Sequence, residues 1–156
     1  MSYDMLILIH LISTLLMLGV GGGSAFYKFM GDRSNNIDVI VHTNKTIVFA
    51  DWIFTTPSAI VQPISGVLLI LETGYSLNES WLLISIFLYV FAGVLWLIAV
   101  HLQLKMKCLS IDAQKEGNTL GDDYFKMVKQ WIILGIFSFL AVAVIFYLMI
   151  MKPIFY

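Results

Sequence analysis

The stretch that decides the fold is residues 5–26, MLILIHLISTLLMLGVGGGSAF, an apolar run interrupted by one ionisable side chain, His10. A run of about 20 apolar residues is long enough to cross a lipid bilayer as a helix. Ionisable groups at membrane depth are costly and usually face a bundle interior, a cofactor or a proton path. The segment therefore predicts a membrane-spanning first helix that carries a candidate ligand.

The whole chain has the composition of an integral membrane protein. Of its 156 residues, 60% are hydrophobic and 12% are charged, whereas a soluble domain carries roughly 25% charged residues. The net charge of −1 provides no basic field, which excludes nucleic acid as a partner. The single cysteine, Cys108, excludes an internal disulfide. The lipid bilayer is thus the first partner that the sequence indicates.

Four apolar stretches are each long enough to span the ~30 Å hydrocarbon core. They run from Met5 to Phe29, Trp52 to Leu71, Trp81 to Leu104 and Trp131 to Met151. None of them alternates with the period of a barrel strand. Short connections between successive helices favour an up-down bundle. We therefore expect an all-α fold, a four-helix transmembrane bundle that forms a single domain over residues 1–156.

The distribution of basic residues predicts the orientation of this bundle. The middle loop, residues 72–79, has no Lys or Arg, whereas the other two connections are basic. Positively charged connections stay on the cytoplasmic side, so both termini are expected outside, in a bacterial inner membrane. The basic residues are Lys28, Arg33 and Lys45 in the first connection, and Lys105, Lys107, Lys115, Lys126 and Lys129 in the third.

Turn residues divide the third connection. The pairs Gly117-Asn118 and Gly121-Asp122 are typical of turns. The third helix is therefore expected to extend into the cytoplasm as far as Gly117. The fourth is expected to begin near Asp122 or Asp123, because acidic residues favour the first turn of a helix.

The first helix also carries the small residues Gly19, Gly21, Gly22, Gly23, Ser24 and Ala25. Small residues let a neighbouring backbone, or a flat cofactor, approach closely. They are not a phosphate-binding loop, since no strand precedes them and no Lys-Ser/Thr follows. Two interpretations stay open, tight helix packing and contact with a cofactor, for which Gly22 is the candidate.

His10 is the candidate axial ligand of a haem, because a histidine inside a bundle can hold haem iron through a ring nitrogen. The alternative is a histidine that is hydrogen-bonded to a neighbouring helix. At the depth of His10, Met149 is the conventional second iron ligand, and a five-coordinate iron is the other option. His42 and His101 are expected near the cytoplasmic side. His101 follows Trp81, which lies at the depth of His10, by twenty residues, or about 30 Å of helix. These two are candidates for a second metal or haem site, or are solvated interfacial histidines.

The second apolar stretch holds the densest polar cluster, DWIFTTP at 51–57 and QPISG at 62–66. Each of the two prolines removes a backbone N–H and frees a carbonyl. Such breaks persist in membranes where side chains, water or a cavity satisfy the freed groups. The alternatives are a polar cavity at mid-depth that Gln62 faces, and a kinked helix satisfied by its own hydroxyls. Asp51 is expected at the cytoplasmic edge, where it can pair with a nearby Lys or Arg.

These residues carry a resemblance that covers nearly the whole chain. The strings at 8–27, 50–75, 81–97, 102–106 and 148–153 resemble the predicted bacterial integral membrane proteins of domain-of-unknown-function family 2269. The pieces DWIFTTP and QPISG are the most specific. The first-helix pattern around His10 is also similar to HemJ-type protoporphyrinogen oxidases and copper-resistance D-type membrane domains. That second resemblance implies haem b ligation by His10, although the second helix departs from the HemJ pattern.

Three functions are open at this point. The first is a haem b-binding redox protein, a small b-type cytochrome or a membrane oxidoreductase, with electrons from a quinol or a redox partner subunit. The second is a non-enzymatic subunit or assembly factor of a larger membrane complex. Homo-oligomers formed through small-residue faces fit either one. The third is a transporter, which broken helices favour and four helices without an internal repeat disfavour.

Overall fold

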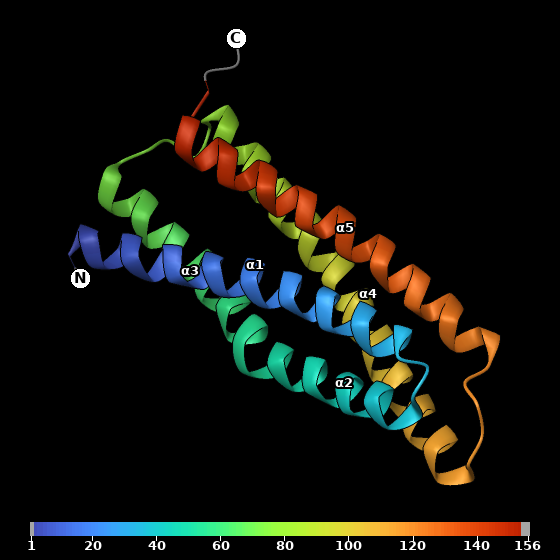
Figure 1. Ribbon diagram of the computed structural model, residues 1–156. Coiled ribbons are helices and arrows are strands. Elements are labelled where there is room, and N and C mark those ends of the chain that lie inside the picture. Colours follow the sequence, from blue (N-terminus) through green and yellow to red (C-terminus); the bar gives the residue numbers. More distant parts are fainter. Residues whose placement is uncertain (1, 154–156) are drawn as a thin grey trace.

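The computed structural model describes residues 2–153, which form five α-helices and one π-helical turn (Figure 1). The elements are α1 (Tyr3–Arg33), α2 (Ile37–Ala50), η1 (Asp51–Thr55), α3 (Thr56–Thr73), α4 (Ser80–Glu116) and α5 (Asp122–Met151). Because α2, η1 and α3 follow each other without a break, the chain makes four long helical passes. Each is long and apolar enough to cross a membrane. The all-α four-helix bundle expected from the sequence is confirmed.

The helix ends follow from local chemistry. Gly74 and Gly117 close α3 and α4 with positive φ angles of 71° and 67°, a conformation that glycine adopts without steric cost. The predicted end of the third pass before Gly117 and the start of the fourth at Asp122 are confirmed. The prediction that the second pass begins at Trp52 is wrong. Helix α2 already begins at Ile37, where the Asn36 side chain accepts a hydrogen bond from the Asp38 backbone N–H.

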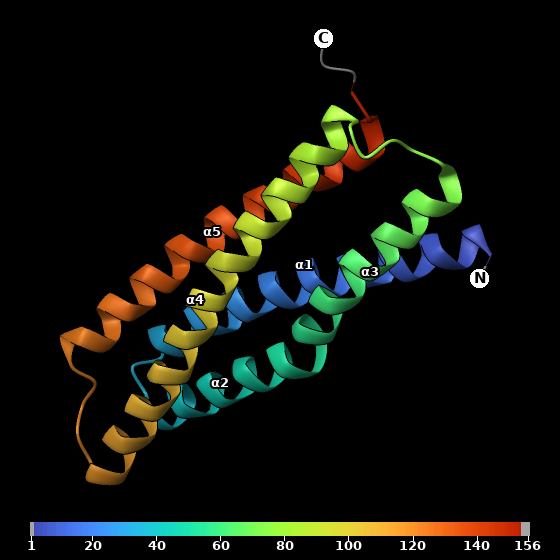
Figure 2. The ribbon, with the colours of Figure 1, turned by 180° about the vertical axis from the view of Figure 1, so that it is seen from behind.

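The helices pack as two pairs that form a wedge. Helices α4 and α5 lie against each other along their length, and α1 packs against α3. Figures 1 and 2 show the two pairs close together at the end where α1 meets α2, and apart at the end with both chain termini. We call these the closed end and the open end. Helix α2 joins the pairs at the closed end through its contacts with both α1 and α4.

The closed end holds most of the buried core. Ile40, Met106, Tyr124 and Trp131 are buried together there, and come from α2, α4 and α5. A smaller cluster of Trp81, Leu82 and Leu148 holds α4 to α5 at the open end. Most other large apolar side chains face outward, as expected where lipid replaces water as the solvent.

A π-helical turn, rather than the prolines alone, bends the second pass. Residues Asp51–Thr55 form η1 immediately before Pro57, and Figure 2 shows α2 and α3 meeting at an angle there. Pro63 lies inside α3 and cannot donate to the carbonyl of Ala59 four residues earlier. The hydroxyl of Tyr89 in α4 donates to that carbonyl at 2.5 Å instead. A neighbouring helix therefore satisfies the carbonyl that the proline leaves free.

Candidate functional site

His10 lies between α1 and α3 and is hydrogen-bonded through both ring nitrogens. Its Nδ1 is 2.9 Å from the Ser65 hydroxyl, and its Nε2 is 3.0 Å from the Gln62 amide nitrogen. The Gln62 amide also donates to the Thr14 hydroxyl at 2.8 Å and accepts from the Ser13 hydroxyl. Four polar side chains thus surround the ring, two from α1 and two from α3. We call these five residues the His10 network.

The tautomer of the ring is assigned from the hydrogen bonds of its neighbours. The Ser65 hydroxyl donates to the Val61 carbonyl at 2.8 Å, so it accepts from His10 and the imidazole proton sits on Nδ1. The Gln62 amide group donates at its nitrogen, so Nε2 of His10 is the acceptor. This assignment follows from the consistency of the whole network. His10 is therefore a neutral imidazole whose Nε2 lone pair points at the Gln62 amide.

Sequence reasoning found only part of this network. His10 and Gln62 were singled out, and the structure brings them together. Ser13 and Thr14 were missed as partners, although they follow His10 by three and four residues, where helical side chains share a face. The Thr14 hydroxyl donates back to the His10 carbonyl at 2.9 Å, and the Ser13 hydroxyl shares its single proton between that carbonyl and the Gln62 amide oxygen. Of the two alternatives for this stretch, the cavity that Gln62 faces is wrong, because Gln62 does not line the cavity described below and its amide is held inside the His10 network.

The other predicted haem residues lie apart from His10. Met149 packs against the Trp81–Leu82–Leu148 cluster of the α4–α5 pair, and is not among the residues that bind the imidazole. Gly22 lines the cavity described below. His42 and His101 have exposed side chains on α2 and α4, so their role in a second metal site stays a prediction.

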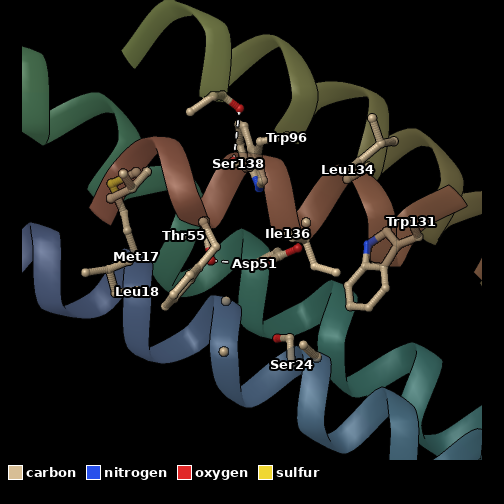
Figure 3. A pocket seen from close by; sticks show the side chains of 18 of the residues that line it. Met17, Leu18, Ser24, Asp51, Thr55, Trp96, Trp131, Leu134, Ile136 and Ser138 are labelled. Atoms are coloured by element: carbon tan, nitrogen blue, oxygen red, sulfur yellow. Dashed lines mark hydrogen bonds between the residues drawn. The ribbon is translucent and has the colours of Figure 1, made fainter. Parts of the chain in front are cut away.

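A cavity of about 450 Å³ lies between the α1–α3 pair and the α4–α5 pair. Figure 3 shows Met17, Leu18 and Ser24 of α1 on one side and Trp96 and Ser138 of the α4–α5 pair on the other. Its lining is mostly apolar, and it contains no Lys or Arg. Polar groups are few and include Asp51, Thr55, Tyr89, Trp96 and Gln103.

Asp51 is the buried acidic group of this cavity. Its side chain is 7% exposed, and Oδ1 accepts a hydrogen bond from the Thr55 hydroxyl at 2.8 Å. The sequence allowed an ion pair between Asp51 and Arg33 or a lysine, but the ion pairs within residues 2–153 are Lys28–Asp32 and Lys126–Asp123. The π-helical turn places the carboxylate and the Thr55 hydroxyl together, facing the cavity (Figure 3).

Gly21 and Gly22 of α1 line the cavity, and none of the four glycines at 19–23 tightens a helix contact. A Cβ atom added at Gly19, Gly21, Gly22 or Gly23 would have no neighbour within 4 Å. The interpretation that these four glycines allow tight helix packing is therefore wrong. The close approach lies instead at Gly31, where an added Cβ would be 2.5 Å from the Thr43 hydroxyl of α2. Gly21 and Gly22 leave space beside the cavity that a flat molecule can use.

Comparison with known proteins identifies a family without assigning an activity. No curated protein and no solved structure matches the chain. The family described as "Predicted integral membrane protein (DUF2269)" matches residues 4–153, which include all four passes, the His10 network and the cavity. The chain therefore belongs to this family and is a multi-pass integral membrane protein.

Proposed function

We propose that this protein binds haem b in the membrane through His10 and takes part in electron transfer. The observation that supports the proposal is the state of the imidazole. Nδ1 carries the proton and is held by Ser65, which leaves Nε2 as the basic nitrogen. Metal-binding histidines characteristically donate their other ring N–H to a protein group, which fixes the tautomer and the ring orientation. His10 already has this arrangement.

Binding of haem iron at His10 requires one side chain to move, and the chain supplies a single axial ligand. Gln62 now donates to Nε2, so its side chain must turn away before the nitrogen binds iron. Its Ser13 and Thr14 contacts would then be broken as well. Met149 is engaged in the Trp81 cluster, so the chain supplies one axial ligand in the present arrangement. A bound haem would supply one-electron redox chemistry. The residues of the chain hold the imidazole ring and set its tautomer.

The proposed setting is the bacterial cytoplasmic membrane, with the closed end facing the cytoplasm. The basic connections lie at that end, and such connections remain on the cytoplasmic side. Electrons would come from a quinol or from a redox partner subunit. The small size of the loops outside the bundle leaves little chain for binding a soluble donor, which favours a donor within the membrane.

A second candidate function is a non-enzymatic subunit of a larger membrane complex, either a hetero-complex or an assembly of several copies of the chain. The favouring observation is that the chain itself satisfies both nitrogens of His10. A network of this kind fixes how α1 and α3 pack without any ligand. In this role, replacing His10 would change stability and leave no spectroscopic trace.

Absorption spectroscopy of the purified protein tests the proposal. Oxidised and dithionite-reduced spectra in mild detergent should show a Soret band and reduced α and β bands. His10→Ala should lose them. Ser65→Ala should still bind haem, but with an affinity about tenfold lower, because the hydrogen bond that orients the ligating imidazole is removed. Gln62→Ala should bind haem at least as well as the wild-type chain, because it frees Nε2.

Matched controls are His42→Ala and His101→Ala, whose side chains are exposed. Either one losing a haem band would indicate the second site. A protein that stays colourless after reconstitution with haem would overturn the cytochrome proposal in favour of the structural role. Intact spectra in the folded His10→Ala variant would remove His10 as the ligand.

A further inference from the structure

The cavity contains a buried hydrogen-bond donor that the haem proposal does not use. The indole Nε1 of Trp96 is inaccessible to solvent and finds no acceptor within residues 2–153. A buried indole N–H usually has a partner, and a donor left unpaired in a low-dielectric interior is costly. Trp96 lines the cavity beside Ser138 (Figure 3). Because Nε1 is closed off in the present arrangement, the indole must turn before this donor meets a ligand in the cavity that brings an acceptor.

The second polar position lies further along the same face of α4. Gln103 follows Trp96 by seven residues, which is two helical turns or about 10 Å along the helix axis. Its side chain is 4% exposed, lines the cavity and neighbours Asp51 of η1. A ring that carries oxygen atoms at opposite positions, with a hydrogen bond of about 3 Å at each end, spans a distance of this order.

The cavity wall between these two positions is formed largely by small residues, which leave open space beside the helices. Small residues from three helices contribute, among them Gly22 of α1, Gly93 of α4 and Gly135 of α5. An added Cβ would have no neighbour within 4 Å at any of the three. Flat apolar molecules fit such a slot. The two helix pairs diverge toward the open end (Figures 1 and 2), which is the direction in which an apolar tail would extend.

The charges of the lining restrict the class of ligand. The cavity has one carboxylate, Asp51, and no Lys or Arg. A phospholipid phosphate would meet this carboxylate without a cation to offset it, which is unfavourable in a low-dielectric site. A neutral head group with acceptor oxygens meets no such repulsion.

We propose that this cavity binds the head group of an isoprenoid quinone. One carbonyl oxygen accepts from Trp96 Nε1 once the indole has turned, the other accepts from the Gln103 amide beside Asp51, and the ring fills the space beside the three glycines. The tail leaves between the helix pairs toward lipid. The site does not include His10, so it rests on the cavity alone and is separable from haem binding.

Isothermal titration calorimetry with a short-chain ubiquinone analogue tests the proposal on the purified chain in detergent. The wild-type protein should bind one equivalent saturably. Trp96→Phe keeps the ring and removes the N–H, so its Kd should rise about tenfold, the effect of one hydrogen bond. Gly22→Leu places a side chain in the cavity and should abolish binding. Gly19→Leu lies on the same helix, also has open space around its Cβ, and should leave the Kd unchanged.

Several results would overturn the proposal. The wild-type chain binding no quinone saturably would do so, as would equal affinities in Gly22→Leu and Gly19→Leu. Displacement of the quinone by anionic phospholipid vesicles, with Trp96→Phe unaffected, would assign the cavity to lipid. His10→Ala should retain the wild-type Kd for quinone, so a colourless protein that still binds quinone refutes only the haem proposal.

Discussion

The two ends of the bundle each contain a polar network between helices, and the networks differ in how many helices they join. At the closed end, the Lys28 ammonium donates to Asp32 at 2.7 Å and to the Tyr124 hydroxyl at 2.5 Å. Tyr124 donates to Asp32 and accepts from Asn44, which also donates to Ser110. These residues come from α1, α2, α4 and α5. The His10 network joins α1 and α3 alone.

The difference explains the shape of the molecule. A network shared by four helices holds all of them at one separation, because each buried polar group needs its partners. Two helices held together at the open end leave the other pair free to diverge. The cavity lies beyond the closed-end network, where the two helix pairs are no longer held together by it. Stability is therefore concentrated at the closed end, and space for ligands lies beyond it.

Breaking the closed-end network should have the largest effect on stability. Lys28 is 1% exposed and its ion-pair partner Asp32 is 13% exposed. Asp32→Ala leaves the ammonium buried without a counter-charge, which typically costs about 3–5 kcal/mol. We expect a matching loss in the free energy of unfolding, measured by denaturant titration in detergent micelles.

The control for this change is Asp123→Ala. Asp123 pairs with Lys126 at 2.9 Å, but both side chains are largely exposed, and such pairs contribute about 0–1 kcal/mol. Equal effects of the two substitutions would show that the closed end does not carry the stability assigned to it.

Glycine substitutions should distinguish the two ends by the sign of their effect. Gly31→Ala at the closed end places a methyl group 2.5 Å from the Thr43 hydroxyl and 2.9 Å from its Cβ. Threonine is stiff at χ1, so the helices must separate, at a cost of about 1–3 kcal/mol. Gly19→Ala meets open space and should stabilise the chain by up to about 1 kcal/mol. Thermal unfolding of both variants checks the prediction, and a stabilised Gly31→Ala would contradict the close α1–α2 contact.

The sequence was sufficient to predict the four passes but not the wedge. Hydropathy identifies a spanning helix because lipid admits little else. It does not distinguish an apolar face that meets lipid from one that meets a cavity, and the glycines of α1 illustrate this. Helix α2 was missed because it carries enough polar residues to resemble a loop. Lys28 was counted only as a cytoplasmic charge, since its burial depends on Tyr124, 96 residues away.

The His10 site was predictable only in part for a related reason. A histidine in an apolar run stands out in a sequence, whereas serines and threonines in membrane helices commonly bond to their own backbone. Ser13, Thr14 and Ser65 do both. Their second role depends on the rotation of α3 about its axis, which packing determines. Cavity residues such as Trp96 had no signal in the sequence, because an indole in a spanning helix is ordinary.

The smallest predicted effect concerns the contact that joins the two pairs near the cavity. The Tyr89 hydroxyl donates to the carbonyl that Pro63 leaves free on Ala59. Tyr89→Phe should cost about 1 kcal/mol, the contribution of one hydrogen bond. Pro63→Ala gives α3 its own N–H donor for that carbonyl, so Tyr89→Phe should cost less in the Pro63→Ala background. A double-mutant cycle of unfolding free energies measures the difference. Zero coupling between the two substitutions would mean that the Tyr89 hydroxyl does not compensate for Pro63. The hydroxyl would then be available to a ligand in the cavity.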